Sequence, residues 1–182
     1  MTAVTVYSAG LVVPITAPPI VDGAVAVREG RIMHVGEREW VLRSLSERGI
    51  DADEVHWPGV LTPGLVNAHT HLQYTGMASV GRGQYDGFDD WVRAFDPVYE
   101  GGRDWAADAA DGAAQALRSG TTAVADVVTD RAAATALHDA RLHGITYWEV
   151  MSWTNADWAR TGRTQVERAR ADLEPTGRCH RR

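Results

Sequence analysis

From Pro58 onward the sequence alternates between apolar, strand-like segments and helical segments. The strand-like segments are rich in β-branched and aromatic residues, as buried parallel strands are. They are residues 64–69 (GLVNAH), 121–128 (TTAVADVV) and 145–153 (ITYWEVMSW). Residues 103–120 and 130–144 separate them, carry small apolar residues at helical spacing and end in glycine. Right-handed crossovers return each strand beside the previous one, so this alternation predicts an α/β fold with a parallel sheet.

A further helix is predicted after the third strand. Thr164 and Glu167 have the spacing of a capping box, and Pro175 follows the apolar positions of this segment. The sequence therefore predicts a helix that begins at Thr164.

The first 60 residues have a different pattern of short strands. Val25 and Val27 precede a Glu29-Gly30 pair, and Ile32 follows it, which predicts a tight hairpin. Residues 37–49 then suit an amphipathic helix that stops at a glycine. We expect residues 1–60 to form a small β module and residues 61–182 to form a second domain.

Two architectures contain such a parallel sheet, a (β/α)₈ barrel and a doubly wound sheet. A dinucleotide-binding doubly wound sheet has a Gly-rich turn after its first strand, and VNAHTHLQYTG is not such a turn. The barrel is therefore favoured. A whole barrel takes about 250 residues, so we expect this chain to hold the N-terminal part of one, about three of its eight units.

His69 and His71 lie one residue apart at the end of the first of these strands. Alternate side chains of an extended strand project to the same side, so both imidazoles can reach one ion. Imidazole suits zinc and other borderline metals, and barrel enzymes keep their catalytic groups at the carboxyl ends of the strands. His-x-His by itself also arises by chance. The residues around the pair decide whether the two histidines are metal ligands or ordinary core or surface residues.

Those residues form a longer pattern, PGLVNAHTH, over 63–71. It resembles the signature of the metal-dependent amidohydrolase superfamily, Pro-Gly, two apolar residues, Asn-x-His-x-His. DGAVAVREGRIMHVG is similar to the hairpin of that superfamily's small β-sandwich module, and RSGTTAVADV to its second barrel strand. HTHLQYTG with the later Phe88-x-x-Trp91 is most similar to the aminohydrolase branch, in particular aminofutalosine deaminase-like proteins, although Gln73 stands where those have Glu.

The resemblance implies a β-sandwich module followed by a barrel, and a reaction in which one divalent ion, Zn or Fe, activates water. That water would deaminate a small-molecule substrate with a purine-like or related C–N bond. His69 and His71 are then metal ligands. The other ligands and the proton-shuttling Glu come from later strands, so the catalytic residues are expected beyond residue 182.

Two alternatives stay open. A cyclic-amide hydrolase of the same superfamily would use two metals and a bridging carboxylated lysine, and this segment contains no Lys. The chain could instead be a catalytically silent truncated remnant or an interaction module. Three βα units leave an open sheet edge, which predicts association with another copy, as a homodimer.

Substrate-binding candidates lie near the pair and at the strand ends. Gln73 and Tyr74 follow the histidines directly, Trp91 belongs to a helical segment that it could simply anchor, and Glu149 lies in the third strand. Asp126 ends the second strand, where a role in supporting the site competes with a structural one.

Charge and cysteine content exclude several other classes. The net charge of -6 is spread over mixed-sign segments without a basic stripe, which argues against nucleic acid. No apolar run approaches the roughly 20 residues of a membrane span. A single cysteine, Cys179, and an N-terminus without a leader pattern favour the cytoplasm. The basic ending GRCHRR departs from the βα pattern, which suggests a premature end or a frameshifted tail.

Overall fold

The chain divides into two compact units, residues 1–63 and 64–182, and each is described by itself. The computed structural model describes residues 3–150 and 154–173. The elements of the first unit are β1 (Val4–Val12), β2 (Ile20–Arg28), β3 (Arg31–Glu37), α1 (Arg38–Ser46) and β4 (Ala52–Leu61).

The first unit is a four-stranded sheet in the order β3-β2-β1-β4. β2 and β3 form the predicted hairpin, in which Arg28 pairs with Arg31 and both turn residues, Glu29 and Gly30, have positive φ. β1 pairs with β2 antiparallel and with β4 parallel. Helix α1 packs Val41 and Leu45 against one face of this sheet. Within residues 3–63 the strands form this single sheet, without the second layer of a sandwich.

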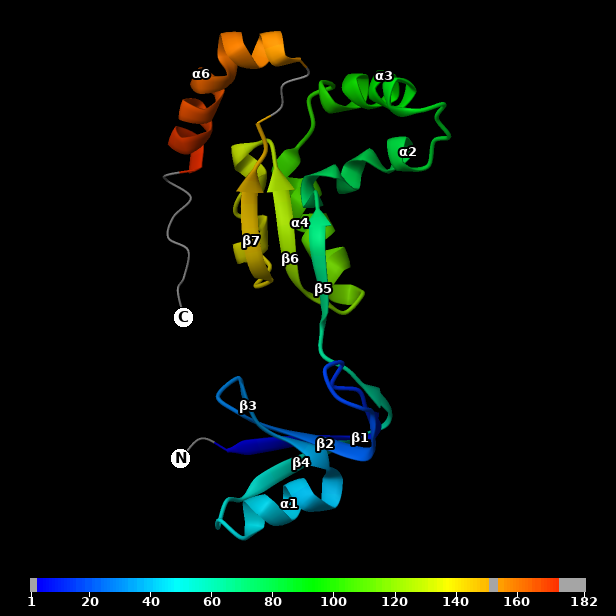
Figure 1. Cartoon of the computed structure of the whole chain (residues 1–182), viewed down its shortest axis with the longest axis vertical. Coiled ribbons are helices and arrows are strands. Elements are labelled where there is room, and N and C mark those ends of the chain that lie inside the picture. Colours follow the sequence, from blue (N-terminus) through cyan, green and yellow to red (C-terminus); the bar gives the residue numbers. More distant parts are fainter. Residues whose placement is uncertain (1–2, 151–153, 174–182) are drawn as a thin grey trace. The chain divides into compact units, whose positions relative to one another are not determined.

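The second unit alternates strands and helices, as the sequence predicts (Figure 1). Its strands are β5 (Leu65–Thr70), β6 (Thr121–Val128) and β7 (His143–Trp148). Its helices are η1 (Leu72–Met77), α2 (Ala78–Gly81), α3 (Phe88–Tyr99), α4 (Trp105–Arg118), η2 (Arg131–Ala133), α5 (Ala136–Asp139) and α6 (Asn155–Leu173).

The three strands form a parallel sheet in the order β5-β6-β7. Their carboxyl ends therefore meet at one edge, as the aligned arrowheads in Figure 1 show. Ala109 and Ala113 of α4 pack with Val124 and Val128 of β6 in a buried apolar cluster. The core of this unit thus lies between one face of the sheet and its helices.

Three expectations about element boundaries are wrong. Residues 130–144 form two short helical pieces, η2 and α5, because Asp130 caps a separate first turn by accepting from the backbone N of Ala132. Helix α6 begins at Asn155 instead of Thr164, since Thr154 Oγ1 already accepts from the backbone N of Asp157. β7 ends at Trp148, so Glu149 follows the strand, and residues 151–153 lie outside the described part of the chain.

Among the described residues, we find no helix with the length and apolar character that crossing a membrane requires.

Candidate metal centre

His69 and His71 lie at the carboxyl end of β5, the first strand of the parallel sheet. His69 is the second-last residue of the strand and is exposed, whereas His71 follows the strand and is half-buried. Their ring centres are 5.3 Å apart, with the ring planes tilted by 58°. The structure therefore brings the two predicted ligands together.

This separation fits two ligands of one tetrahedral ion. An imidazole that ligates zinc at about 2.0–2.1 Å has its ring centre about 3.2 Å from the metal. Two such rings at a tetrahedral angle have centres about 5.2 Å apart. The donor set is also suitable, because neutral imidazole is a preferred ligand of zinc and iron.

His71 has the protonation state and the free nitrogen that a ligand needs. Burial lowers the pKa of His71, assisted by nearby His69 and opposed by Glu149 and by a hydrogen bond to the backbone of Val127. Its Nδ1 is buried and has no hydrogen-bond partner among the described residues. Metal-ligating histidines commonly engage one ring nitrogen with a carbonyl or carboxylate and leave the other for the ion.

In the part of the chain that the structure describes, the pair has no third ligand. No group of three or more His, Cys, Asp or Glu side chains lies close enough there to hold a metal ion. A catalytic zinc site normally has three protein ligands and one open position. The described residues therefore supply part of such a site.

The strand pairing is irregular where the histidines lie. Asn67 pairs with Val124 and Thr70 with Asp126, so three residues of β5 advance against two of β6. This is a β-bulge, a device that re-aims side chains near the end of a strand. Side chains hold the backbone on both sides of it: Asn67 Oδ1 accepts from the N of His69 at 3.2 Å, and Asp126 Oδ1 accepts from the N of Leu72 at 2.9 Å.

Asp126 is a fully buried carboxyl group at the second strand. Burial raises its pKa to about 6, although the hydrogen bond from Leu72 acts in the opposite direction. Its Oδ2 has no partner within the described residues. It lies two residues before the end of β6, facing the helix side with Val124 and Val128.

Gln73 is also fully buried, and both ends of its amide bind Thr129 in the loop after β6. Its Nε2 donates to Thr129 Oγ1 at 2.6 Å, and its Oε1 accepts from the backbone N of Thr129 at 3.0 Å. The hydroxyl of Tyr99 donates to the same Thr129 Oγ1 at 2.9 Å. Gln73 thus connects η1 to the loop after β6.

Tyr74 links the histidines to an aromatic cluster on α3. Its ring stacks on His71 with centres 4.6 Å apart and meets Phe95 and Trp105 edge to face. Burial raises the pKa of Tyr74 to about 12, so its phenol stays neutral. Trp91 stacks on Phe95 at 4.7 Å and belongs to this cluster rather than to the contacts of the histidines.

Glu149 directly follows β7, at the edge that carries the histidines, and its backbone N donates to Val128 O at 2.8 Å. Its charge acts on both His71 and Tyr74. Sequence reasoning missed Thr129 and Tyr99. The position of Thr129 just after a buried strand was the available signal, whereas nothing in the sequence singles out Tyr99.

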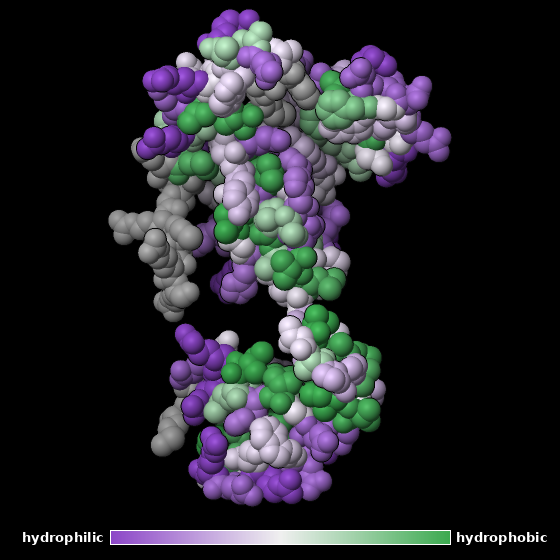
Figure 2. Space-filling view, in the orientation of Figure 1, coloured by the Kyte–Doolittle hydropathy of each residue, from purple (hydrophilic) through white to green (hydrophobic). Residues whose placement is uncertain are grey.

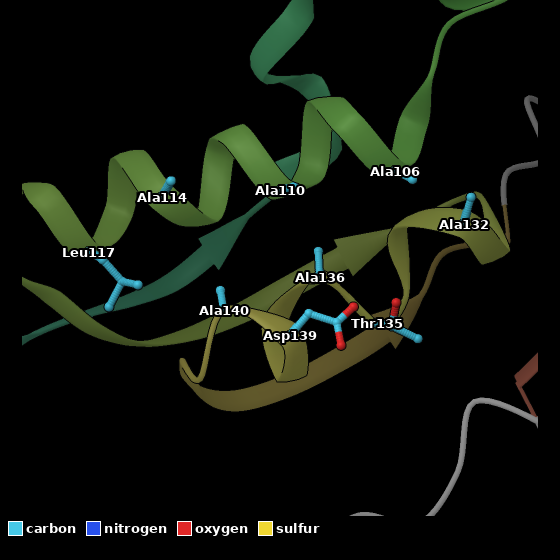
Figure 3. Close-up of a pocket in the computed structure, with 9 residues that line it drawn as sticks. All are labelled: Ala106, Ala110, Ala114, Leu117, Ala132, Thr135, Ala136, Asp139 and Ala140. Atoms are coloured by element: carbon cyan, nitrogen blue, oxygen red, sulfur yellow. The ribbon is translucent and has the colours of Figure 1, made fainter.

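A hollow lies on the helix side of the sheet. Figure 3 shows the methyl groups of Ala106, Ala110 and Ala114 on α4 facing Ala136 of α5 and Ala140, which directly follows α5. The hollow measures 340 Å³, and among the described residues that line it Thr135 and Asp139 are the polar ones. With no histidine at its walls, it is separate from the candidate metal centre.

Comparison with known proteins assigns the family. The model of the amidohydrolase family matches residues 60–175, and the chain belongs to this family. A 5-methylthioadenosine/S-adenosylhomocysteine deaminase of Nitratidesulfovibrio vulgaris is 39% identical over 114 residues, which are 59% of this chain and 24% of that protein. The chain thus spans about a quarter of the length of this curated relative.

Solved structures show the same fold. Helicobacter pylori aminofutalosine deaminase, in complex with methylthio-coformycin, aligns with 92% of this chain and 40% of its own at a TM-score of 0.64 and 18% identity. An adenosine deaminase from Xanthomonas campestris with bound zinc aligns with 91% of this chain and 40% of its own at a TM-score of 0.60 and 25% identity. The mixed α/β fold is therefore that of amidohydrolase-family enzymes.

Proposed function

We propose that this chain is the N-terminal portion of a metal-dependent aminohydrolase that deaminates an adenine-type nucleoside or a related purine-like compound such as aminofutalosine. The observation that carries the proposal is the His69–His71 pair, whose ring separation of 5.3 Å suits one tetrahedral ion at the strand ends of a parallel sheet. The deaminases among its relatives support the reaction class.

The proposed architecture is one sheet of a small β-sandwich module, residues 1–60, followed by the first part of a (β/α)₈ barrel, residues 61–182. One face of the parallel sheet packs on α4, while the other carries Val66, Ile145 and Tyr147, which are 71%, 56% and 49% exposed. Register places all three on the side opposite Val124 and Val128. Figure 2 shows apolar residues among polar ones in this unit. A barrel interior, filled by inward side chains, would cover this face.

The residues of this chain would bind the ion and shape the substrate entrance. His69 and His71 would hold zinc or iron, and burial keeps His71 neutral and ready to ligate. Such an ion would supply the acidity that makes water a nucleophile near neutral pH. Tyr74 orients His71 by stacking on it. Glu149 lies at the same edge, where its carboxylate could meet polar groups of a substrate.

The aromatic cluster offers a second surface for substrate contacts, beyond the metal centre. Phe88 is exposed and stacks on Trp91, which makes these rings a surface on which a planar heteroaromatic base could lie. Gln73 is engaged by Thr129, so a contact between its amide and the substrate requires that both hydrogen bonds open.

Zinc titration of the 182-residue chain tests the metal centre. We expect one weak site, since two histidines supply only part of the usual ligand set. It should be lost in His69→Ala and in His71→Ala and kept in His143→Ala, because His143 is an exposed histidine at the amino end of β7. Binding that persists in both pair variants would contradict the proposal.

A chimera tests the reaction. Residues 60–175 of this chain would replace the matching segment of the N. vulgaris deaminase. We expect ammonia release from 5-methylthioadenosine, abolished by His69→Ala and kept by His143→Ala. A chimera that folds and holds zinc but releases no ammonia from methylthioadenosine, S-adenosylhomocysteine or adenosine would count against this function.

A further inference from the structure

The backbone around the histidine pair is not held by regular strand pairing. Between Asn67 and Thr70 the ladder of β5 and β6 shifts by one residue, and His69 lies inside this irregular stretch. His71 lies beyond the last paired residue, with φ of -123° and ψ of 86°. Something other than the ladder must therefore fix the backbone at His71.

Asp126 fixes the backbone on both sides of His71. Its backbone pairs with Thr70, which precedes His71, and its side-chain Oδ1 accepts from the N of Leu72, which follows His71. One residue of β6 thus holds the chain on both sides of the second histidine. The Gln73–Thr129 hydrogen bonds add a second attachment one residue further on.

The surroundings of Asp126 argue that its carboxyl group has a purpose other than packing. It is 0% exposed and lies between Val124 and Val128 on the apolar face of β6. Burying a carboxyl group there costs free energy that an apolar residue would not. Its hydrogen bond goes to the backbone amide of Leu72, which directly follows His71.

We infer that Asp126 is a positioning residue for His71: its hydrogen bond to the amide of Leu72 sets the orientation of the His71 imidazole toward His69. The inference rests on the proposed metal centre, because the orientation matters only if the two rings share an ion. Outer-shell groups of this kind are typically worth about 10- to 100-fold in metal affinity.

The experiment compares Asp126→Asn with Asp126→Leu in the 182-residue chain. Asn keeps an oxygen that accepts from Leu72, whereas Leu has a similar size and no acceptor. We expect zinc affinity within about threefold of the parent for Asp126→Asn, and a loss of about 10- to 100-fold for Asp126→Leu. Asp139→Leu, which changes an exposed carboxylate on α5, should leave zinc affinity unchanged.

NMR of the zinc-free chain provides a second readout. In Asp126→Leu the amide of Leu72 should exchange faster and the His71 ring protons should shift as their stacking on Tyr74 changes, and Asp126→Asn should restore both. A folded Asp126→Leu with unchanged His71 signals and unchanged zinc affinity overturns the inference. If Asp126→Leu does not fold, Asp126→Asn still decides, since a folded Asn variant with faster Leu72 exchange and displaced His71 signals also overturns it.

The two readouts separate this inference from the proposed function. If the parent chain binds no zinc through the histidine pair, the proposed metal centre fails. The zinc-free spectra of the Asp126 variants still show whether this carboxyl group orients His71.

Discussion

The rings of His71 and Tyr74 lie parallel, 4.6 Å apart with an interplanar angle of 7°. The contact is local, because the backbone N of Tyr74 also donates to the O of His71 at 2.9 Å. Tyr74 in turn meets Phe95, Tyr99 and Trp105 edge to face. The second histidine therefore rests on an aromatic cluster that α3 and α4 supply.

Replacing Tyr74 should separate the role of its ring from that of its hydroxyl. Tyr74→Ala leaves a cavity among four rings and should lower the free energy of unfolding by about 3 kcal/mol. Tyr74→Phe keeps the stack and loses only the hydrogen bond to Thr129, which should cost about 1 kcal/mol. Urea unfolding measures both, and equal losses would show that the ring contacts contribute little.

Acid should weaken an ion pair of the first unit. Hydrogen bonds from Arg38 and then from Ser8 lower the pKa of Glu54 from 4.5 to about 2. A carboxyl group with a lowered folded pKa stabilises the protein above its unfolded pKa, and this contribution is lost as the pH falls from 4.5 toward 2.

Glu54→Gln tests this prediction, with the free energy of unfolding measured in urea over this pH range. The pair is partly exposed, so we expect a loss of about 1 kcal/mol at pH 7. The difference from the parent should vanish near pH 2. A difference that stays constant with pH would mean that the carboxylate charge is not its source.

Gly144 should tolerate no side chain. Its φ is +138°, and a Cβ there would lie 1.8 Å from the backbone O of Val124 on the neighbouring strand. Gly144→Ala should therefore lower the free energy of unfolding by about 3 kcal/mol. Gly81→Ala is the control, because a Cβ at Gly81 meets nothing within 4 Å and should change stability by less than about 0.5 kcal/mol.

The start of α6 can be tested with two threonines. Thr154→Ala removes the oxygen that accepts from the N of Asp157 and should cost about 1 kcal/mol of helix stability. Thr164 lies inside α6, where alanine is the better helix former, so Thr164→Ala should stabilise the helix slightly. Amide exchange along α6 measures the two effects, and the opposite ranking would restore Thr164 as the cap.

The sequence predicted the strands well because each is an apolar run with a distinct boundary. The hairpin at Glu29-Gly30 and the parallel order of β5, β6 and β7 follow from local turn chemistry and from crossover handedness. The error at Thr164 has a simple cause. Thr-x-x-Glu and Thr-x-x-Asp both satisfy the capping pattern, and local sequence does not decide which one the helix uses.

The histidine pair was predictable because its spacing suits an extended strand. The hydrogen bonds that hold the backbone beside the pair were not predictable from the sequence. The partnership of Gln73 with Thr129 spans 56 residues, and that of Leu72 with Asp126 spans 54, so both depend on the register between strands. A bulge at Ala68–His69 leaves no mark in the residue types, since alanine and histidine occur in regular strands as well.

That bulge determines on which face of the sheet His69 and His71 lie. Asn67 and Thr70 are three residues apart, yet they pair with Val124 and Asp126, which are two apart. If the same residues paired regularly from Asn67 onward, His69 would lie opposite Asp126 and both imidazoles would turn to the helix side of the sheet. The extra residue therefore places both histidines on the face of the sheet that carries Val66.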